Sequence, residues 1–337
     1  MEINSLYIGH ASVIIDFQLD FYIKDKNKGR SEKMIEQTWG IRTEKKKVIR
    51  DSEKKIYAIR DIEGDEWIVK GEKAPLWQVE QQAQFANKLI GILPVPRYKK
   101  TQDEVYAVAK DGLTWTIETR QFGREVNHLT DSMLLSMATM LGKLHAESLR
   151  QSYRFHRATS WSLFGGNATE AIGDYDENEL SFLEMKAAYG QENIFEEIET
   201  QYLAHRTYLK NCWKRLPIAA VQGDFCHYNM LFDGDCVQSV FDFNLAGDER
   251  LLNECIAVAV YCCWHVESDS MFSAEERYTL FTEAYQKHRV WTKEERVVAK
   301  RLKAIIRAFR YDRVARGIEN VANRHLFLEE TLQILKT

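Results

Sequence analysis

The sequence predicts an α+β protein of two lobes, in which a smaller, strand-rich lobe precedes a larger, mostly helical one. Two patterns support this class. Short apolar runs of period two, separated by turn-forming residues, occupy residues 46–70, whereas apolar residues recur at helical spacing after Gly123. The length of 337 residues suits about two domains. We expect an N-terminal extension at 1–30 whose role the sequence leaves open, a small lobe at 31–122 and a large lobe at 123–337.

The charge balance and the apolar runs limit the partners that the sequence favours. Lys and Arg number 46 against 50 Asp and Glu, so the net charge of −4 gives no reason to expect nucleic acid or a membrane surface as partner. No uncharged apolar run reaches about eighteen residues, and the start lacks a basic signal region, so we expect a cytoplasmic protein. We expect the cysteines to be buried free thiols. A metal site of Cys262, Cys263 and His265 is less favoured, because its spacing matches no zinc pattern.

The small lobe is expected to contain five strands and two helices. Turn sequences at 51–54 and 63–65 separate its first three strands, and Asp111-Gly112 predicts the turn of a hairpin. Pro75 near the start and Gly91 just past the end delimit its longer helix. The expected elements, in order, are a helix at 32–40, strands at 46–50, 55–61 and 66–70, a helix at 75–91, and strands at 105–110 and 115–122.

The large lobe is expected to be helical apart from one segment. A helix at 131–149, with Asp131 as a candidate N-cap, is followed by polar residues without a strong period. Helices are predicted at 178–189 and 192–215, and again after residue 249. The segment between them, 221–249, combines apolar strand-like runs with polar residues.

Two aspartates and an asparagine stand out in this segment, at Asp224, Asn229 and Asp242. The turn around Gly234 predicts a hairpin, and a turn centred there sets residue 242 opposite residue 226. Asp224 and Asp242 then converge at the open end of the hairpin, with Asn229 beside them. Two carboxylates and an amide oxygen suit Mg²⁺. The alternative is that these are turn and cap residues around an ordinary buried hairpin.

The runs QGDFCHYNML (222–231) and FDF (241–243) resemble the signature of the aminoglycoside phosphotransferase superfamily, which includes choline, homoserine and fructosamine kinases. The resemblance implies a protein-kinase-like fold and ATP- and Mg²⁺-dependent transfer of the γ-phosphate to a small-molecule hydroxyl. It implies Asp224 as catalytic base and Asn229 and Asp242 as Mg²⁺ ligands. Gln222 stands where the family usually has a histidine that supports the loop.

In the small lobe the resemblance also implies nucleotide-binding residues. Lys70 ends a predicted strand and Glu80 lies on the following helix, at the spacing of the family's lysine–glutamate pair. A solvated strand end is the alternative for Lys70. The backbone of Thr119, Arg120 and Gln121 is expected to meet the adenine edge. The turn 51–55, which contains no glycine, would cover the phosphates. This and the missing A-P-E motif favour a small-molecule kinase over a protein kinase.

Two histidines near these motifs admit more than one role. His145, in a helix that resembles the family's L-A-x-L-H segment, is expected to be structural rather than catalytic. His227, between the base and a metal ligand, either contacts substrate or packs.

The sequence leaves the acceptor, the choice between ATP and another nucleoside triphosphate, and the oligomeric state open. Acids of the large lobe favour an amino alcohol, an amino sugar or an aminoglycoside, although solvated helix faces explain most such acids. Tryptophans could line a site for a quaternary amine, although core packing explains them as well. We expect the basic run at 301–316 to form salt bridges between helices or to bind an acidic substrate. The acids and tryptophans in question are Asp174, Asp176, Glu177, Glu179, Asp248, Glu249, Glu254 and Glu267, with Trp161, Trp213 and Trp264.

The alternative function is a catalytically weak or inactive nucleotide-binding scaffold, or a spore-coat-type member of the family.

Overall fold

A computed structural model describes residues 28–159, 162–165 and 176–336. Its contacts group the chain into two units. The first contains the residues up to Val126 together with His227–Asn244, and the second contains Asn127–Cys226 and the residues from Leu245 onward. The first break lies close to the expected boundary at 122, but the hairpin that carries Asn229 and Asp242 groups with the first unit rather than with the large lobe. Most of the expected N-terminal extension, residues 1–27, lies outside the described residues.

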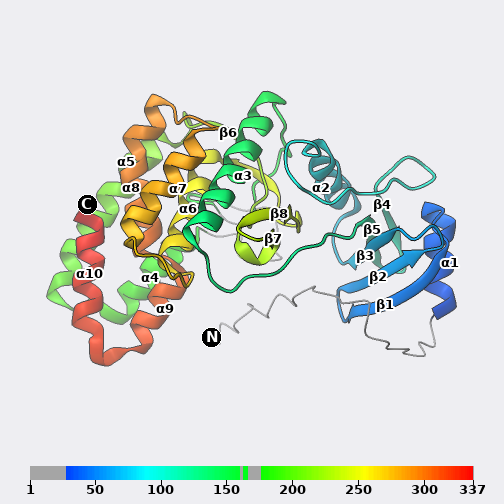
Figure 1. Ribbon diagram of the computed structural model, residues 1–337. Helices are drawn as coiled ribbons and strands as arrows, with labels where there is room; N and C mark the ends of the chain where they lie inside the picture. Colours follow the sequence, from blue (N-terminus) through cyan, green and yellow to red (C-terminus); the bar gives the residue numbers. More distant parts are fainter. Residues whose placement is uncertain (1–27, 160–161, 166–175, 337) are drawn as a thin grey trace. The chain divides into compact units, whose positions relative to one another are not determined.

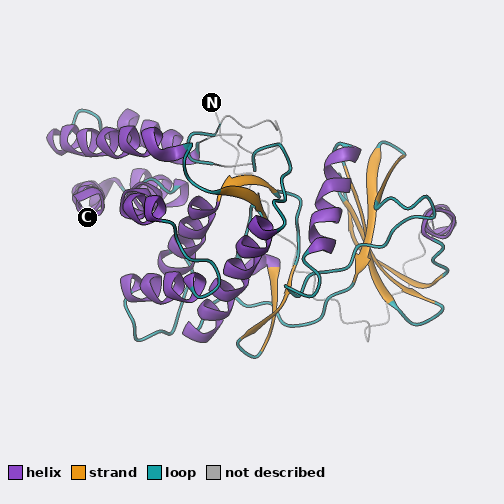
Figure 2. Ribbon diagram, turned by 90° about the horizontal axis from the view of Figure 1, so that it is seen from above, coloured by secondary structure: helices purple, strands orange, loops and turns teal. Residues whose placement is uncertain are grey.

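The first unit is built on a five-stranded antiparallel sheet of order β1-β2-β3-β5-β4. Helices α1 and α2 lie on its opposite faces (Figures 1 and 2). The α+β prediction is confirmed, as is the hairpin at Asp111-Gly112, where both residues have positive φ. The elements are α1 (Lys28–Trp39), β1 (Thr43–Asp51), β2 (Lys55–Asp61), β3 (Glu66–Glu72), α2 (Leu76–Lys88), β4 (Ala107–Lys110) and β5 (Leu113–Thr119).

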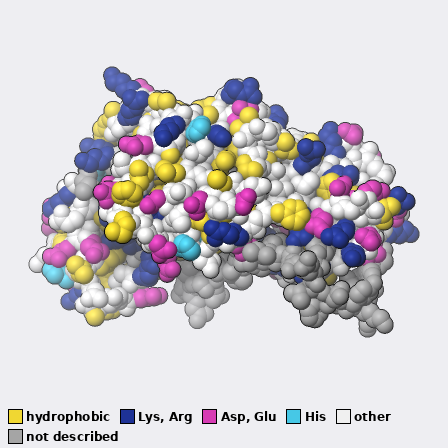
Figure 3. All heavy atoms as spheres, viewed as in Figure 1, with side chains coloured by type: hydrophobic (Ala, Val, Ile, Leu, Met, Phe, Trp, Pro, Cys, Tyr) yellow, Lys and Arg dark blue, Asp and Glu magenta, His cyan; other side chains and the backbone are white. Residues whose placement is uncertain are grey.

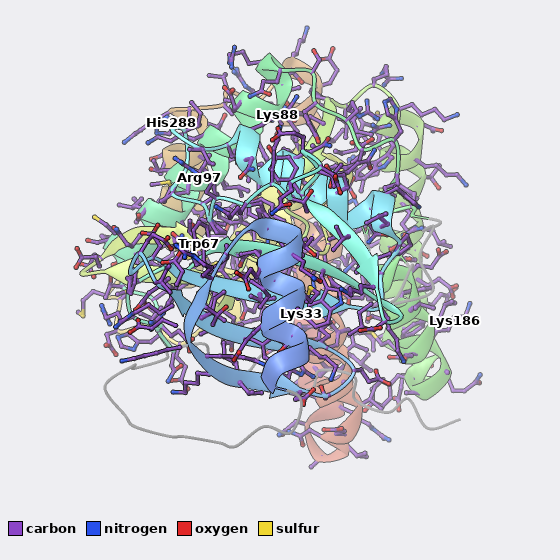
Figure 4. The ribbon with its side chains drawn as sticks, turned by 90° about the vertical axis from the view of Figure 1, so that its right-hand side faces the viewer. Lys33, Trp67, Lys88, Arg97, Lys186 and His288 are labelled. Carbon is purple, nitrogen blue, oxygen red and sulfur yellow. The ribbon has the colours of Figure 1, made fainter. Side chains whose placement is uncertain are left out.

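Alternation along the strands gives the sheet two chemically different faces. The face under α1 is apolar, and Tyr57 stacks there on Trp115 with ring centroids 6.1 Å apart. Gly71, which is paired with Trp115, leaves room for the indole, since a Cβ would lie 2.8 Å from its ring. Figure 4 looks onto α1, whose Lys33 is exposed while the next two residues are buried. The opposite face carries Lys70 and therefore forms the candidate site.

A short hairpin completes the first unit. Its strands are β7 (Met230–Asp233) and β8 (Cys236–Val240), and it follows a 3-10 turn at His227–Asn229. Backbone bonds between Arg124 and Phe232, both of 2.9 Å, attach it to the segment after β5. A register shift between Leu231 and Phe232 moves the pairing, so that Met230 faces Val240. The predicted register, which set residue 242 opposite 226, is therefore wrong by two residues.

The second unit is mostly helical, with one two-stranded sheet that the sequence did not predict. Strands β6 (Ile218–Val221) and β9 (Gly247–Arg250) pair antiparallel on either side of the motif segment. Thr130, not Asp131, caps α3, because its side chain accepts the Met133 N–H at 3.1 Å. The helices are α3 (Asp131–Arg150), α4 (Glu177–Tyr189), α5 (Asn193–Trp213), α6 (Leu251–Trp264), α7 (Ala274–Gln286), α8 (Lys293–Ala308), α9 (Tyr311–Glu319) and α10 (Arg324–Lys336), with a 3-10 turn at Val321–Asn323.

Helix α6 forms the centre of this unit. Nearly all of its residues are buried, as expected for a helix that is apolar on every side. On the surface, basic and acidic side chains are interspersed (Figure 3), and ion pairs such as Lys186–Glu199 at 2.5 Å join many of them. Among the described helices, none has the length and apolar character that crossing a membrane requires.

Candidate active site

Lys70 lies on the face of the sheet opposite α1 and is held by a carboxylate of the neighbouring strand. Its Nζ is 2.6 Å from Oε1 of Glu118 on β5. Burial disfavours the ammonium, but the charges of Glu118, Asp242 and Glu72 outweigh that effect and raise the pKa of Lys70 above its ordinary value. Lys70 is therefore a fixed cation at neutral pH. The alternative that it is a solvated strand end is wrong, because three quarters of its side chain is buried.

The expected partner of Lys70, Glu80, has a different position. Its Oε2 accepts the backbone N–H groups of Tyr106 at 2.7 Å and Ala107 at 2.9 Å, so it fastens α2 to the start of β4. The sequence spacing placed an acid on the right helix, but not on the face that meets the lysine. That face carries Val79 and Gln82 instead. The predicted Lys70–Glu80 pair is thus replaced by Lys70–Glu118.

A small polar cavity of about 20 Å³ adjoins Lys70. Such a volume accommodates roughly one water molecule or ion. Burial raises the pKa of the Tyr98 hydroxyl, and the nearby charges of Glu118, Asp242 and Glu72 raise it further. The charges of Glu118, Asp242 and Glu72 act on the Lys70 ammonium, and a second ammonium, that of Lys54, pairs with Glu72 at 3.9 Å. The lining residues are Lys70, Glu72, Val79, Gln82, Tyr98, Thr116, Asp242, Phe243 and Asn244.

The backbone of Asn229 pairs with that of Phe241, the residue before Asp242, at the open end of the hairpin. The Phe241 N–H donates to the Asn229 carbonyl at 3.0 Å, and Asn229 is buried. Asp242 adopts a left-handed backbone, with φ of 59°, which is uncommon for a residue other than glycine. An amide and a carboxylate oxygen are hard donors that fit Mg²⁺. Among the described residues no three His, Cys, Asp or Glu side chains form a metal cage, so a cation here would need further oxygen ligands.

The loop of Asp224 belongs to the second unit, and buried oxygens fix its backbone. Gln222 Oε1 accepts the Asp224 N–H at 2.8 Å, and Glu254 Oε1 accepts the Gly223 N–H at 2.7 Å. Asp224 itself is half-buried, whereas residues on both sides of it are buried. Gln222 thus supports the loop, as expected for the position where the family has histidine. The two hydrogen bonds hold the backbone at Gly223 and Asp224.

His145 contacts Glu254, the residue that accepts the Gly223 N–H. Its Nε2 lies 2.6 Å from Glu254, and its Nδ1 lies 2.7 Å from the Tyr285 hydroxyl. Burial lowers the pKa of His145, although Glu254 opposes this effect. The ring is fully buried and contacts structural groups. The expectation of a structural histidine agrees with these contacts.

The segment Thr119–Gln121 has its first two N–H groups already bonded. Thr119 donates to Arg97 and Arg120 donates to Glu66, both at 2.9 Å. The Arg120 guanidinium pairs with Glu66 at 2.7 Å. Gln121 Nε2 donates to the carbonyls of Thr119 and Arg120 at 3.2 and 3.3 Å. The N–H groups of Thr119 and Arg120 and the Arg120 side chain are thus already engaged within the unit.

Two of the acids that suggested a cationic acceptor, Asp248 and Asp176, have structural roles. Asp248 accepts the N–H groups of Phe155 and His156 at 2.8 and 2.9 Å. Asp176 caps α4 and pairs with Arg206. Two of the residues named for the acceptor, Asp174 and Trp161, lie outside the described residues.

The tryptophans and the basic run pack within the second unit. The Arg307 guanidinium covers the Trp264 ring at 4.5 Å, and Trp213 packs edge-on against Phe164. Arg310 pairs with Asp312 at 2.8 Å. These contacts favour packing and inter-helix pairing for these side chains.

The roles of Glu118 and Gln82 near Lys70, and of Glu254 beside Gly223, were not predicted from the sequence, in which Glu254 was named only among the acids of a possible acceptor site. One signal was present for Glu118. In LTWTIET the polar residues Thr114, Thr116 and Glu118 alternate with apolar ones, which sets Glu118 on one polar face of a strand. For Gln82 and Glu254 no local pattern distinguished them from other helix residues.

Residues 55–291 match the phosphotransferase enzyme family. The chain belongs to this family. The resemblance found in the sequence is thereby confirmed, and the chain is a small-molecule phosphotransferase with an alcohol group as acceptor. A comparison with curated proteins finds no match.

Solved structures of similar fold support the protein-kinase-like architecture. The amicoumacin kinase hAmiN, in complex with AMP-PNP, Ca²⁺ and Ami, has a TM-score of 0.60 at 11% identity, over 92% of this chain and 93% of that one. An aminoglycoside phosphotransferase from Alicyclobacillus acidocaldarius has a TM-score of 0.57 at 12% identity, over 87% and 92%. A macrolide 2'-phosphotransferase from Brachybacterium faecium has 0.52 at 12%, over 92% and 98%. At such identities the likeness concerns the fold.

Proposed function

We propose that this phosphotransferase uses ATP and Mg²⁺ to phosphorylate a hydroxyl of an amino alcohol, an amino sugar or an aminoglycoside. The proposal rests on the mostly buried ammonium of Lys70, whose pKa is raised in part by the charge of Asp242. Asp242 follows a hairpin that Asn229 precedes. The nucleotide and cation are supported by the AMP-PNP and Ca²⁺ in the amicoumacin kinase complex. The acceptor class is supported by the names of the similar enzymes.

Lys70 and the hairpin residues would bind the phosphates. The Lys70 ammonium neutralises phosphate charge, and its own carboxylate partner keeps it in place. Asn229 and Asp242 would hold Mg²⁺. When bound, this ion would neutralise the negative charge that develops on the phosphoryl oxygens. The carbonyl oxygens at Thr119 and Arg120 would accept from an exocyclic amine of the base.

Asp224 would accept the proton of the acceptor hydroxyl. Phosphoryl transfer depends mainly on positioning and on charge neutralisation, so a carboxylate of ordinary basicity suffices as a base. The bonds from Gly223 to Glu254 and from Asp224 to Gln222 fix the backbone that carries it. The glutamine at 222 is therefore compatible with an active enzyme.

The test compares native protein with Asp224→Asn over a panel of amino alcohols, sugars and aminoglycosides. Asp233→Asn is the matched control, because Asp233 is an exposed aspartate in the turn of the hairpin. We expect ATP turnover with at least one acceptor, a loss of roughly 10²-fold or more in Asp224→Asn, unchanged nucleotide affinity, and native rates in Asp233→Asn. Nucleotide binding with equal background rates in all three proteins would identify a non-catalytic scaffold and overturn the proposal.

A further inference from the structure

We propose that Glu118 on β5, and not an acid of helix α2, is the positioning residue that holds Lys70 for the nucleotide phosphates. The inference rests on the proposed function, because it assumes that Lys70 meets phosphate. It goes further in assigning the partner, and with it the part of the fold that controls the site. The contact that holds the Lys70 ammonium lies within the sheet, and α2 has a separate role.

The pairing of the strands builds this contact into the sheet. Lys70 lies opposite Thr116, and Glu118 lies opposite Ile68, so Lys70 and Glu118 are diagonal neighbours on one face. Long side chains at such positions reach one another. The measured distance from Nζ to Oε1 is 2.6 Å, and the Glu118 side chain is 5% exposed. Strand β5 is flanked by β3 and β4, which fixes its backbone on both sides.

Helix α2 offers no competing carboxylate. Glu80 is its single acid, and both of its oxygens accept hydrogen bonds elsewhere: Oε2 from Tyr106 and Ala107, Oε1 from Gln84 at 3.0 Å. A glutamate in that position caps two N–H groups at the start of a strand. Its removal would loosen the α2–β4 junction without changing the charge next to Lys70.

The polar residue of α2 that lines the cavity, Gln82, is a neutral amide. Gln82 donates to the backbone carbonyl of Asn244 at 2.6 Å, two residues after Asp242. Phe85 of the same helix packs edge-on against Phe243 at 5.9 Å. Helix α2 therefore contacts the segment after Asp242, whereas Lys70 depends on β5. Two elements position two parts of the site independently.

Loss of the Glu118 charge would release Lys70 toward the remaining acids of the cavity, Glu72 and Asp242. The ammonium would then be displaced from its present position, and its contribution to phosphate binding would fall. Binding of a nucleoside without phosphates would be unaffected, because Lys70 does not act on it. This difference between phosphate and nucleoside separates a positioning role from a general loss of structure.

The experiment measures the affinities of AMP-PNP with Mg²⁺ and of adenosine by calorimetry. We expect Glu118→Gln to weaken AMP-PNP binding about tenfold or more while adenosine binding stays within about twofold. The matched control Glu80→Gln should leave both affinities within about twofold. Glu118→Gln added to Lys70→Ala should produce no further loss, because the residues act as one unit.

Three results would overturn the inference: a larger loss of AMP-PNP affinity in Glu80→Gln than in Glu118→Gln, equal losses for AMP-PNP and adenosine, or additive losses in the double variant. Should Glu118→Gln fail to fold, Glu118→Asp decides, since it keeps the charge but withdraws it by one methylene. Glu118→Asp should weaken the binding of AMP-PNP but not that of adenosine. An AMP-PNP affinity equal to that of native protein would refute the inference. Absence of AMP-PNP binding by native protein would instead refute the proposed function.

Discussion

The backbone N–H of Gly223 donates to the buried carboxylate of Glu254 at 2.7 Å, and the same carboxylate meets His145 at 2.6 Å through its other oxygen. One acid on helix α6 thus joins the loop of Asp224 to the interior of the second unit. The position of the proposed base follows from this bond, because Gly223 is its immediate neighbour in the chain.

Replacing Glu254 by leucine removes both acceptors and leaves two buried donors unsatisfied, each at a cost of about 1–3 kcal/mol. Glutamine can still accept from Gly223 and can donate to His145, whose other nitrogen then donates to Tyr285. We expect Glu254→Leu to lower kcat roughly 10- to 100-fold and to lower Tm, and Glu254→Gln to retain most of the activity. Turnover assays and thermal melts check this, and equal damage in both variants would contradict it.

Gly223 should not tolerate a side chain. Its φ is 87°, and a Cβ would lie 2.3 Å from the carbonyl oxygen of Leu245. Gly64, in the turn between β2 and β3, has φ of 92° but no atom within 4 Å of the Cβ position. We expect Gly64→Ala to cost about 1–3 kcal/mol from backbone strain alone, and Gly223→Ala to cost more than about 4 kcal/mol. Urea denaturation measures both, and equal costs would show that the loop adapts.

Glu249 should make stability depend on pH near neutrality. Burial raises its pKa to about 7, despite hydrogen bonds from Ser162 and the Arg250 N–H. The folded state therefore holds the proton more tightly than the unfolded state, and the free energy of unfolding falls as pH rises from about 4.5 to about 7. Glu249→Gln should not show this decrease in the free energy of unfolding. Between pH 4.5 and pH 8 its stability should therefore rise by roughly 3 kcal/mol relative to that of native protein. A pH-independent difference between the two would contradict the assignment.

The cysteines should differ strongly in reactivity. Cys236 is exposed, whereas Cys255, Cys262 and Cys263 are buried, and burial raises the pKa of the Cys263 thiol to about 12. We expect an alkylating reagent at pH 8 to modify Cys236 in the folded protein, and the three buried thiols of α6 only after denaturation. Peptide mapping by mass spectrometry distinguishes the sites. Modification of Cys262 at the rate of Cys236 would show that α6 opens in the native state.

Local patterns predicted the elements well where periodicity was strong. The helix expected at 131–149 is α3, and the strands expected at 55–61 and 66–70 are β2 and β3. Strand β9 was missed because GDER has no apolar alternation, and it forms only because β6 pairs with it. The hairpin β7–β8 was found from its turn, but its register depended on a bulge that the sequence does not signal.

By itself the sequence determined the α+β class, the Asp224, Asn229 and Asp242 motif, and Lys70 as the cation of the strand, because these depend on residue type and short spacing. Only the tertiary structure decided that Glu118 and not Glu80 faces Lys70, and that Glu254 holds Gly223. Both contacts join residues far apart in the chain. Their partners are set by strand register and by which face of a helix is buried, and these are properties of packing that spacing along one chain does not encode.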